Sequence, residues 1–199
     1  MCYWIKRFKE KRLLKKIRVL QSERLSGQVP DVKIQAEIKH LQALAKLYGK
    51  CFGLKHYPYA LEMQENAHRN AAYIGGFASE HWLGQELIKH GRIRLEWQNA
   101  QVIANEDNQK KLDDLFTQGY LYLEKASLHD VEALRLMGLC HIHAWGKPLN
   151  RKKGFALIVD SINREDSWDK LPEIFAKIGL NKPEFLKELI KYRTTGGQE

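Results

Sequence analysis

The chain has 199 residues, of which 44% are apolar and 29% charged, a balance typical of a soluble globular protein. No stretch approaches the roughly 20 apolar residues of a membrane-spanning helix, and lysines and arginines interrupt the N-terminal segment where a secretory signal needs an apolar core. The three cysteines, Cys2, Cys51 and Cys140, have no disulfide-framework spacing. We therefore expect a protein of a reducing compartment, most simply the cytoplasm.

The formal net charge of +9 is concentrated at the N-terminus. Residues 1–24 hold nine lysines and arginines against two glutamates, which leaves this segment at +7. The other 175 residues carry 24 basic and 22 acidic groups. Nucleic-acid-binding folds usually spread positive charge over a face or groove, so the body of the chain does not resemble one.

The first predicted element is a helix over residues 1–24 with two apolar faces. Trp4, Ile5 and Phe8 cluster on one side at 100° per residue, and the opposite side holds the apolar residues Leu13, Leu14, Ile17 and Leu20. A turn over 26–31 precedes a second helix, which begins at Asp31 and ends at Gly49. Two different apolar faces suit a helix that meets different neighbours along its length, or one whose tip lies on a membrane surface.

The rest of the chain also has helical spacing of its apolar residues. Helices are predicted over 58–75, 79–90, 109–127, 130–144, 150–162, 170–178 and 181–190. Gly91 is expected to end the helix over 79–90. The segment 92–107 stays ambiguous, because Ile93, Leu95 and Trp97 alternate like a strand although 96–104 also fits a helix.

Together these elements predict an all-α fold, a short α-solenoid of antiparallel helical pairs with an N-terminal basic helix. The predicted division is a basic helical segment over 1–24, a single helical-repeat domain over 31–193 and a flexible tail over 194–199. An internal match supports the solenoid, because residues 59–92 resemble residues 113–146 at an offset of 54. The paired positions are Leu61 with Leu115, Gln64 with Gln118, Ala72 with Ala126, Gly84 with Gly138 and Ile88 with Ile142.

One of these pairs, Gly84 with Gly138, consists of glycines within helices. A helical glycine costs about 1 kcal/mol relative to alanine, so its recurrence indicates that another helix approaches closely there. We predict that the following small or apolar residues pack helices together: Ala72, Gly84, Ala126, Ala133, Met137, Gly138, Gly146 and Ala156.

Residues 123–158 resemble a Sel-one-like repeat, a relative of the tetratricopeptide repeat. In the family pattern, small residues end one helix and a polar turn follows, and here these are Ala126 and Asp130. The next helix has an alanine and a hydrophobic–glycine pair, here Ala133 and Met137-Gly138. A glycine loop at Gly146 then leads to a second helix that contains Phe155-Ala156. His141 stands where the family has an aromatic residue, and a weaker copy over 71–91 has Leu87 there. The resemblance implies a curved stack of helical pairs that binds other proteins and carries no catalytic residues.

The stretch EALRLMGLCHIHAWG, residues 132–146, raises the question of a metal site. Cys140 and His143 share one helix face, but His141 points about 200° away from His143. Structural zinc usually takes four ligands from two spaced pairs, and no second pair has convincing spacing. Cys140 also continues an apolar stripe of Ala133, Leu136, Met137 and Ala144, so we predict a packed helix and no metal.

The sequence contains no recognisable catalytic motif, such as GxSxG, HExxH or a phosphate-binding glycine loop. The other histidines are scattered, and paired acids such as Asp113-Asp114 suit helix starts and solvated faces. We expect a non-enzyme that has no cofactor and no small-molecule substrate.

Three interpretations of the basic segment stay open: contact with a protein partner, docking on an anionic membrane, and nucleic-acid binding, which the lack of base-reading motifs makes the least favoured. Its predicted basic surface comprises Lys6, Arg7, Lys9, Lys11, Arg12, Lys15, Lys16 and Arg18. The candidates for contact with a partner are the aromatic residues Tyr57, Tyr59, Trp97 and Trp168, although a place in the core is the more favoured interpretation of each. Whether Cys2 is acylated also stays open.

The leading functional hypothesis is a protein-binding adaptor or scaffold subunit of a bacterial assembly, such as a secretion or envelope complex. One alternative is an immunity protein that neutralises a cognate toxin. The other is a peripheral membrane binder or a nucleic-acid binder that acts through residues 1–24. A membrane binder of this kind would lie at the inner face of a membrane. Deletion of residues 1–24 is expected to separate repeat-mediated from charge-mediated binding.

Overall fold

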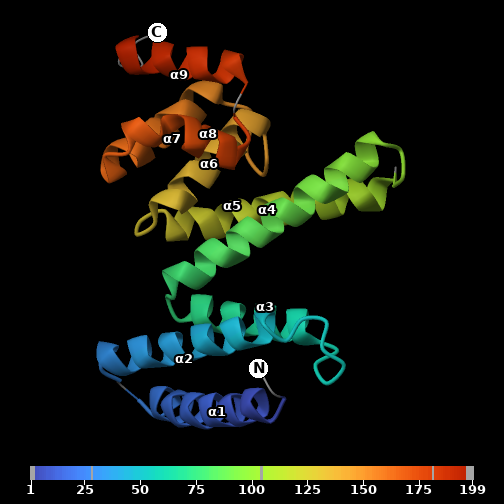
Figure 1. Ribbon diagram of the computed structural model, residues 1–199, viewed down its shortest axis with the longest axis vertical. Helices are drawn as coiled ribbons and strands as arrows, with labels where there is room; N and C mark the ends of the chain where they lie inside the picture. Colours follow the sequence, from blue (N-terminus) through green and yellow to red (C-terminus); the bar gives the residue numbers. More distant parts are fainter. Residues whose placement is uncertain (1–2, 28, 104, 181, 196–199) are drawn as a thin grey trace. The chain divides into compact units, whose positions relative to one another are not determined.

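The computed structural model describes residues 3–27, 29–103, 105–180 and 182–195 (Figure 1). These residues form helices and turns without any β-strand, which confirms the predicted all-α class. The elements in chain order are α1 (Tyr3–Leu25), α2 (Asp31–Gly49), α3 (Ala60–Tyr73), α4 (Phe77–Asn99), α5 (Glu106–Ala126), α6 (Val131–His143), α7 (Arg151–Glu165), the short 3₁₀ helix η1 (Trp168–Lys170), α8 (Leu171–Ile178) and α9 (Pro183–Thr195).

The chain divides into two compact units, Met1–Leu83 and Gly84–Glu199. Within the first unit α1 packs on α2 and α2 packs on α3, and within the second α6 packs on both α5 and α7. Helices that are neighbours in sequence therefore pair in space, as the helical-repeat class requires. The predicted division into 1–24, 31–193 and 194–199 stays a prediction.

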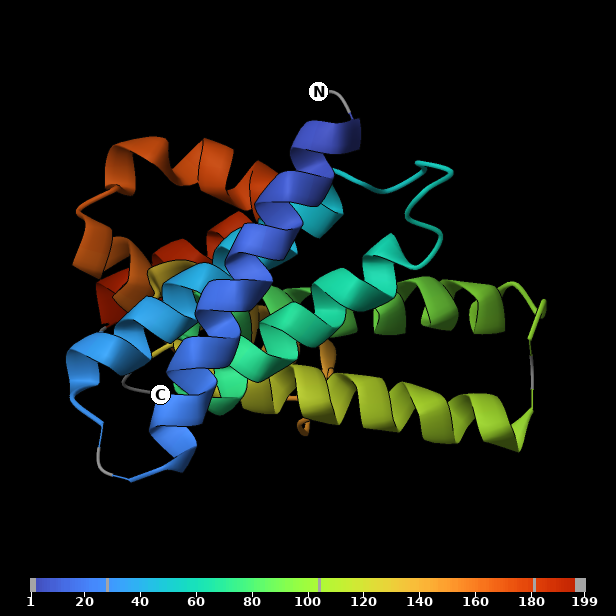
Figure 2. The same cartoon turned by 90° about the horizontal axis from the view of Figure 1, so that it is seen from below.

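The first unit is built on a core shared by its helices. Figures 1 and 2 show α1 lying along α2. Ile17 of α1 is buried against α2 and the segment after it, in a cluster that contains Leu41, Leu44, Leu47, Tyr48, Cys51, Tyr57, Ala60 and Ala71. The basic N-terminal helix is therefore part of a folded unit.

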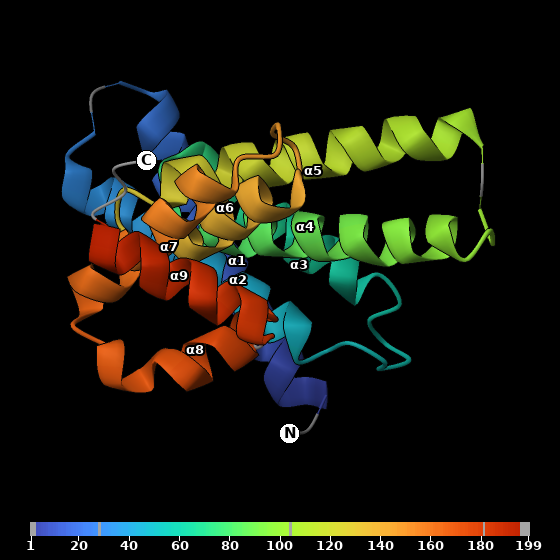
Figure 3. The same cartoon turned by 90° about the horizontal axis from the view of Figure 1, so that it is seen from above.

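In the second unit, α5 and the part of α4 from Gly84 onwards form a long hairpin whose far end extends beyond α6–α9 (Figures 1 and 3). The expected helix end at Gly91 is wrong, because α4 continues through it to Asn99. A Cβ atom on Gly91 would lie 2.6 Å from the ring of Phe116 on α5, so this glycine makes room for a neighbouring ring. The ambiguous segment is thus helical as far as Asn99, and Ile93 and Trp97 lie in α4.

A buried amide joins the two helices of this hairpin near its far end. Asn108 of α5 is 1% exposed, and its side-chain oxygen accepts a hydrogen bond from Arg94 of α4 at 2.7 Å. Its side-chain nitrogen donates to Gln98 at 2.6 Å, and its backbone N–H donates to the capping side chain of Asn105 at 2.8 Å. The bonds to Arg94 and Gln98 hold the two helices together, and the bond to Asn105 caps the start of α5.

In each of the hairpins α4–α5 and α6–α7, the two helices pack on each other through equivalent contacts. A Cβ atom on Gly84 would lie 3.0 Å from the Gly119 carbonyl oxygen, and a Cβ atom on Gly138 would lie 2.7 Å from the Gly154 carbonyl oxygen. In the reverse direction Gly119 contacts Ile88 and Gly154 contacts Ile142. In the first helix of each hairpin, α4 or α6, the glycine and the isoleucine are residues that the offset of 54 pairs: Gly84 with Gly138, and Ile88 with Ile142. The internal match therefore corresponds to a repeated packing geometry.

The second helices of the two hairpins follow a different offset. Gly119 and Gly154 are 35 positions apart, as are Leu123 and Ile158, which contact Gly84 and Gly138 respectively. The first hairpin is therefore 19 residues longer than the second between its equivalent glycines. These extra residues form the far ends of α4 and α5 and the turn between them, and so contain the insertion expected around 92–107.

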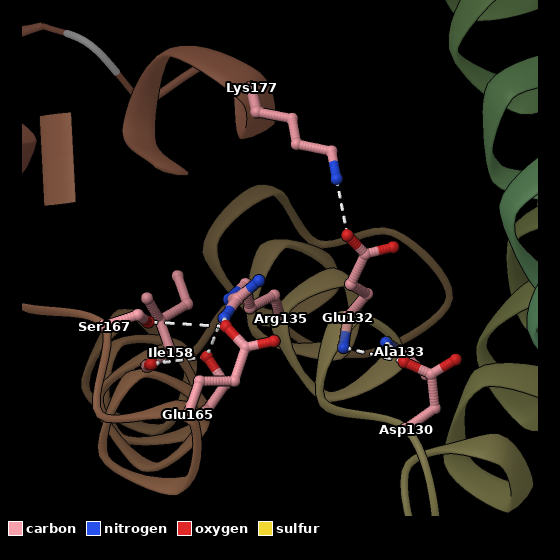
Figure 4. Close-up of polar contacts among 9 residues, drawn as sticks. Asp130, Glu132, Ala133, Arg135, Ile158, Glu165, Ser167 and Lys177 are labelled. Carbon is pink, nitrogen blue, oxygen red and sulfur yellow. Dashed lines mark hydrogen bonds and ion pairs between the residues drawn. The ribbon is translucent and has the colours of Figure 1, made fainter. Parts of the chain in front are cut away.

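Two sets of polar contacts stabilise the α6–α7 hairpin. Asp130 caps α6 by accepting hydrogen bonds from the backbone amides of Glu132 at 2.8 Å and Ala133 at 3.3 Å. Figure 4 shows Arg135 reaching from α6 to α7, where this buried guanidinium donates to the Ser161 hydroxyl at 3.1 Å and pairs with Glu165. The cap fixes the start of α6, and the guanidinium ties α6 to α7.

The remaining predicted boundaries agree with the structure to within a few residues. Asn150 caps α7, as expected, by accepting a hydrogen bond from the Lys153 amide at 2.9 Å. Asn181, the expected cap of the last helix, lies outside the described residues. Helix α9 reaches Thr195, so the predicted tail begins with helix at 194–195, and 196–199 lie outside the described residues.

Candidate partner-binding surfaces

The predicted helix-packing residues lie mostly in the interior. Ala126 and Ala133 are fully buried and Met137 nearly so, all in one cluster with Tyr120 and Cys140. Ala72 is also buried, whereas Ala156 is half-buried. Gly146 has φ +70°, and its α-carbon packs against the backbone carbonyl of Phe116, so a side chain there would be strained for two reasons.

The cysteine and the two histidines considered as metal ligands, Cys140, His141 and His143, lie in different surroundings. Cys140 is fully buried, and burial raises the pKa of its thiol to about 12. His141 is buried, with Nε2 3.2 Å from the Tyr120 hydroxyl and the two rings in an edge-on contact. His143 is exposed and stacks on Trp145 at 4.7 Å. Across the described residues, no group of three or more potential ligands is arranged to hold a metal ion.

A serine–histidine pair that the sequence did not reveal occurs in the first unit. The Nδ1 atom of His68 on α3 lies 3.1 Å from the Ser79 hydroxyl on α4, and the imidazole stacks on Trp82 at 4.1 Å. Burial lowers the pKa of His68 to about 4. Ser79 is fully buried and its oxygen cannot reach a substrate, so the pair holds the first turn of α4 on α3.

The N-terminal end of α1 is held by buried polar contacts, which correct two predictions. Lys6 is a buried residue whose ammonium donates to the Lys50 carbonyl at 2.7 Å, so it does not belong to the basic surface. Glu10 is 2% exposed and accepts hydrogen bonds from the hydroxyls of Tyr48 and Tyr57, each at 3.1 Å. Tyr57 is therefore a core residue and cannot contact a partner. Burial and the adjacent carboxylate raise its pKa to about 12.

The solvent-facing side of α1 combines cations with apolar side chains. Trp4 and Phe8 are 76% and 68% exposed, and Ile5 is also exposed. Arg7 pairs with Glu10 at 2.8 Å, while the remaining predicted cations are exposed: Lys9, Lys11, Arg12, Lys15, Lys16 and Arg18. Among the described helices, none has both the length and the apolar character needed to cross a membrane.

A groove of about 370 Å³ runs between α1 and α2, and we call it the cationic groove. Its apolar side chains are Leu13 of α1 and Ala43 and Leu47 of α2, and its cations are Lys9, Arg12, Lys16, Lys46 and Lys50. In the described part of the chain, none of these five cations lies in an ion pair with a carboxylate. Sequence analysis missed Lys46 and Lys50, although their spacing of four places them on one face of α2.

The other aromatic candidates differ in accessibility. Tyr59 in the first unit is exposed, and Trp97 at the far end of α4 is 49% exposed. Trp168 is half-buried: its indole N–H donates to Asn163 at 2.8 Å and the Arg193 guanidinium lies 4.0 Å above its ring. Tyr59 and Trp97 therefore remain available to a partner, whereas Trp168 is occupied by contacts within its own unit.

No protein-family model matches this chain, and no curated protein is significantly similar to it in sequence. The resemblance of residues 123–158 to a Sel-one-like repeat therefore depends on the residues themselves.

Proposed function

We propose that this chain is a non-enzymatic, protein-binding helical-repeat protein that serves as an adaptor or scaffold subunit of a larger bacterial assembly, such as a secretion or envelope complex. The observation that carries the proposal is the far end of the α4–α5 hairpin, where Trp97 and Val102 are exposed beside a buried Asn108. The resemblance to Sel-one-like repeats supports the same class of function.

The hairpin end exposes apolar side chains that contribute little to the core. Val102 is 70% exposed, and its backbone N–H donates to the Trp97 carbonyl at 2.9 Å, which fixes the turn of the backbone after α4. The hydrogen bonds of Asn108 to Arg94 and Gln98 fix the helices beneath them. Exposed aromatic side chains on rigid elements are the usual anchors of protein–protein interfaces.

Replacing Trp97 by alanine should reduce capture of the native partner at least tenfold, which corresponds to about 1.4 kcal/mol or more at an interface anchor. The measurement is affinity capture of the full-length chain from its native cells, quantified by mass spectrometry. A single partner held with roughly picomolar affinity would identify an immunity protein rather than an adaptor.

Leu128→Ala is the matched control for this experiment, because Leu128 is also an exposed apolar residue of the second unit, outside the hairpin end. Both variants should unfold like the parent chain to within about 0.5 kcal/mol, since surface substitutions rarely do more. Equal capture by parent and Trp97→Ala chains would refute the assignment of the hairpin end.

We also propose peripheral docking of the first unit on anionic membranes as a second candidate function. The observation that favours it is the solvent-facing side of α1, where Trp4 and Phe8 protrude beside Lys11, Arg12 and Lys15. Such apolar side chains can enter the bilayer interface while neighbouring cations remain at the headgroups.

The double variant Trp4→Ser/Phe8→Ser should lower binding to vesicles that contain about one third phosphatidylserine by roughly tenfold, as measured by co-sedimentation. Binding by the parent chain should also fall steeply towards about 0.5 M salt. The control is Tyr59→Ser/Tyr73→Ser, which removes two exposed aromatic side chains of the same unit outside α1. Equal binding to uncharged vesicles, or equal loss in both variants, would rule out docking through α1.

A further inference from the structure

We infer that the cationic groove between α1 and α2 binds an acidic amphipathic helix of a partner protein. The inference rests on the proposed protein-binding function, since it names a class of partner for it. It concerns a surface other than the hairpin end, so each can be tested without the other.

The cations of the groove form two rows, one on each helix. Lys9, Arg12 and Lys16 follow one another at helical spacings of three and four along α1, and Lys46 and Lys50 are four apart on α2. The α1 row extends over about two helical turns, or roughly 10 Å. Carboxylates on the two flanks of a bound helix would therefore find a cation on either side.

The floor between these rows is apolar. Leu13, Ala43 and Leu47 line it, and Leu47 is buried. A helix with apolar residues at i, i+3 or i+4, and i+7 places them along such a floor while its charged flanks face outwards. The groove thus combines the two complementary features that one acidic amphipathic helix presents.

The positive charge of this region has no internal compensation. None of the five cations of the groove lies in an ion pair within the described part of the chain, although Arg7 and Arg24 of the same helix pair with Glu10 and Glu37. Burial lowers the pKa of His40 on α2, and the charges of Lys16 and Lys39 lower it further. A partner that brings carboxylates relieves this repulsion on binding.

The groove is also fixed in shape before any partner arrives. The hydrogen bond from Lys6 to the Lys50 carbonyl and the bond from Tyr48 to Glu10 hold α1 in one register on α2. Two rows of cations on helices that cannot slide remain at a constant separation. Such preorganisation reduces the entropy lost when a helix binds.

Other anionic macromolecules fit the groove less well. A flat bilayer cannot reach the buried Leu47 at the floor, whereas side chains that project from a helix can. Single-stranded nucleic acid needs aromatic side chains on which bases stack, and the eight lining residues include none. The concave apolar floor therefore favours a helix over a lipid surface or a nucleic acid.

The test uses the full-length chain and a designed helical peptide of about 16 residues, with leucines on one face and glutamates on both flanks. Binding is followed by fluorescence anisotropy of the labelled peptide. The double variant Lys9→Glu/Lys46→Glu, which reverses one charge in each row, should weaken peptide binding at least tenfold. A peptide of identical composition whose leucines are scattered around the helix should bind at least tenfold more weakly to the parent chain.

Lys11→Glu/Lys15→Glu is the matched control, because it changes the net charge equally through exposed lysines of α1 that do not line the groove. It should retain peptide binding to within about threefold at 0.15 M salt, where exposed charges beyond about 8 Å are screened. Circular dichroism should show that both double variants keep the helix content of the parent chain.

Three outcomes would overturn the inference. In the first, the two double variants weaken peptide binding equally. In the second, the parent chain binds the two peptides equally. In the third, Lys9→Glu/Lys46→Glu weakens binding to vesicles or to single-stranded DNA more than it weakens binding to the peptide. Trp97→Ala should leave peptide binding unchanged. Unchanged partner capture by Trp97→Ala, together with intact peptide binding, would refute the hairpin end alone. Loss of partner capture by Trp97→Ala, with no peptide binding by the parent chain, would refute the groove alone.

Discussion

Gly138→Ala should lower the free energy of unfolding by about 2–3 kcal/mol, even though alanine is the better helix former by about 1 kcal/mol. The added Cβ would lie 2.7 Å from the Gly154 carbonyl oxygen and 2.7 Å from Ile158, and the carbonyl belongs to a backbone that cannot move alone. α6 and α7 would have to separate along their shared contact. Urea denaturation followed by circular dichroism measures the change, with attention to whether the two units unfold together.

Gly49→Ala provides the control, because this glycine also lies in a helix but faces a movable neighbour. Its Cβ would meet only the terminal amide of Gln64, at 3.0 Å, and that side chain can rotate away. We expect its free energy of unfolding to change by less than about 0.5 kcal/mol. If the two alanine variants were equally stable, close approach would not be the reason for glycine at position 138.

The glycines that recur at an offset of 54 residues predicted that the same helix–helix contact occurs in both hairpins, because a helical glycine marks a position where another helix approaches closely. Gly84 and Gly138 could be paired for this reason. Gly91 could not be interpreted in the same way, since a glycine before a change of pattern also indicates a helix end. What distinguishes the two cases is the ring of Phe116, which is 25 positions away on another helix and has no local signal.

The burial of polar residues of α1 could not be predicted from the sequence for a related reason. Helical periodicity treats one helix at a time, so a segment rich in lysine and arginine appears wholly solvated. The burial of Lys6 and Glu10 depends on Lys50, Tyr48 and Tyr57, which are about forty positions away. The cationic groove likewise needs lysines from two helices.

These contacts change the experiment that best tests the role of charge. Deletion of residues 1–24 would remove Ile17 from the core and leave the hydroxyls of Tyr48 and Tyr57 without their acceptor, so the first unit would lose its fold along with its cations. Reversal of exposed charges leaves these contacts intact. Paired lysine-to-glutamate variants therefore separate electrostatic binding from folding, which the deletion cannot do.

Glu10→Ala should be the most destabilising substitution in α1, with a loss of about 3 kcal/mol in the free energy of unfolding. The carboxylate is 2% exposed, and its removal leaves two buried tyrosine hydroxyls and the Arg7 guanidinium without their acceptor. The measurement is urea denaturation of the full-length chain. Adding Tyr48→Phe and Tyr57→Phe to Glu10→Ala should recover part of the loss, because no buried donor then remains unsatisfied.

The matched control is Glu65→Ala, which breaks an exposed pair with Arg69 that is 2.6 Å long and lies within a single helix. Exposed pairs of this kind contribute only about 0.3–0.5 kcal/mol, so this variant should be close to the parent chain in stability. A Glu10→Ala variant as stable as Glu65→Ala would mean that α1 does not depend on its buried carboxylate. The register of α1 on α2, on which the shape of the cationic groove depends, would then be held by the Lys6–Lys50 hydrogen bond and by Ile17 without a contribution from Glu10.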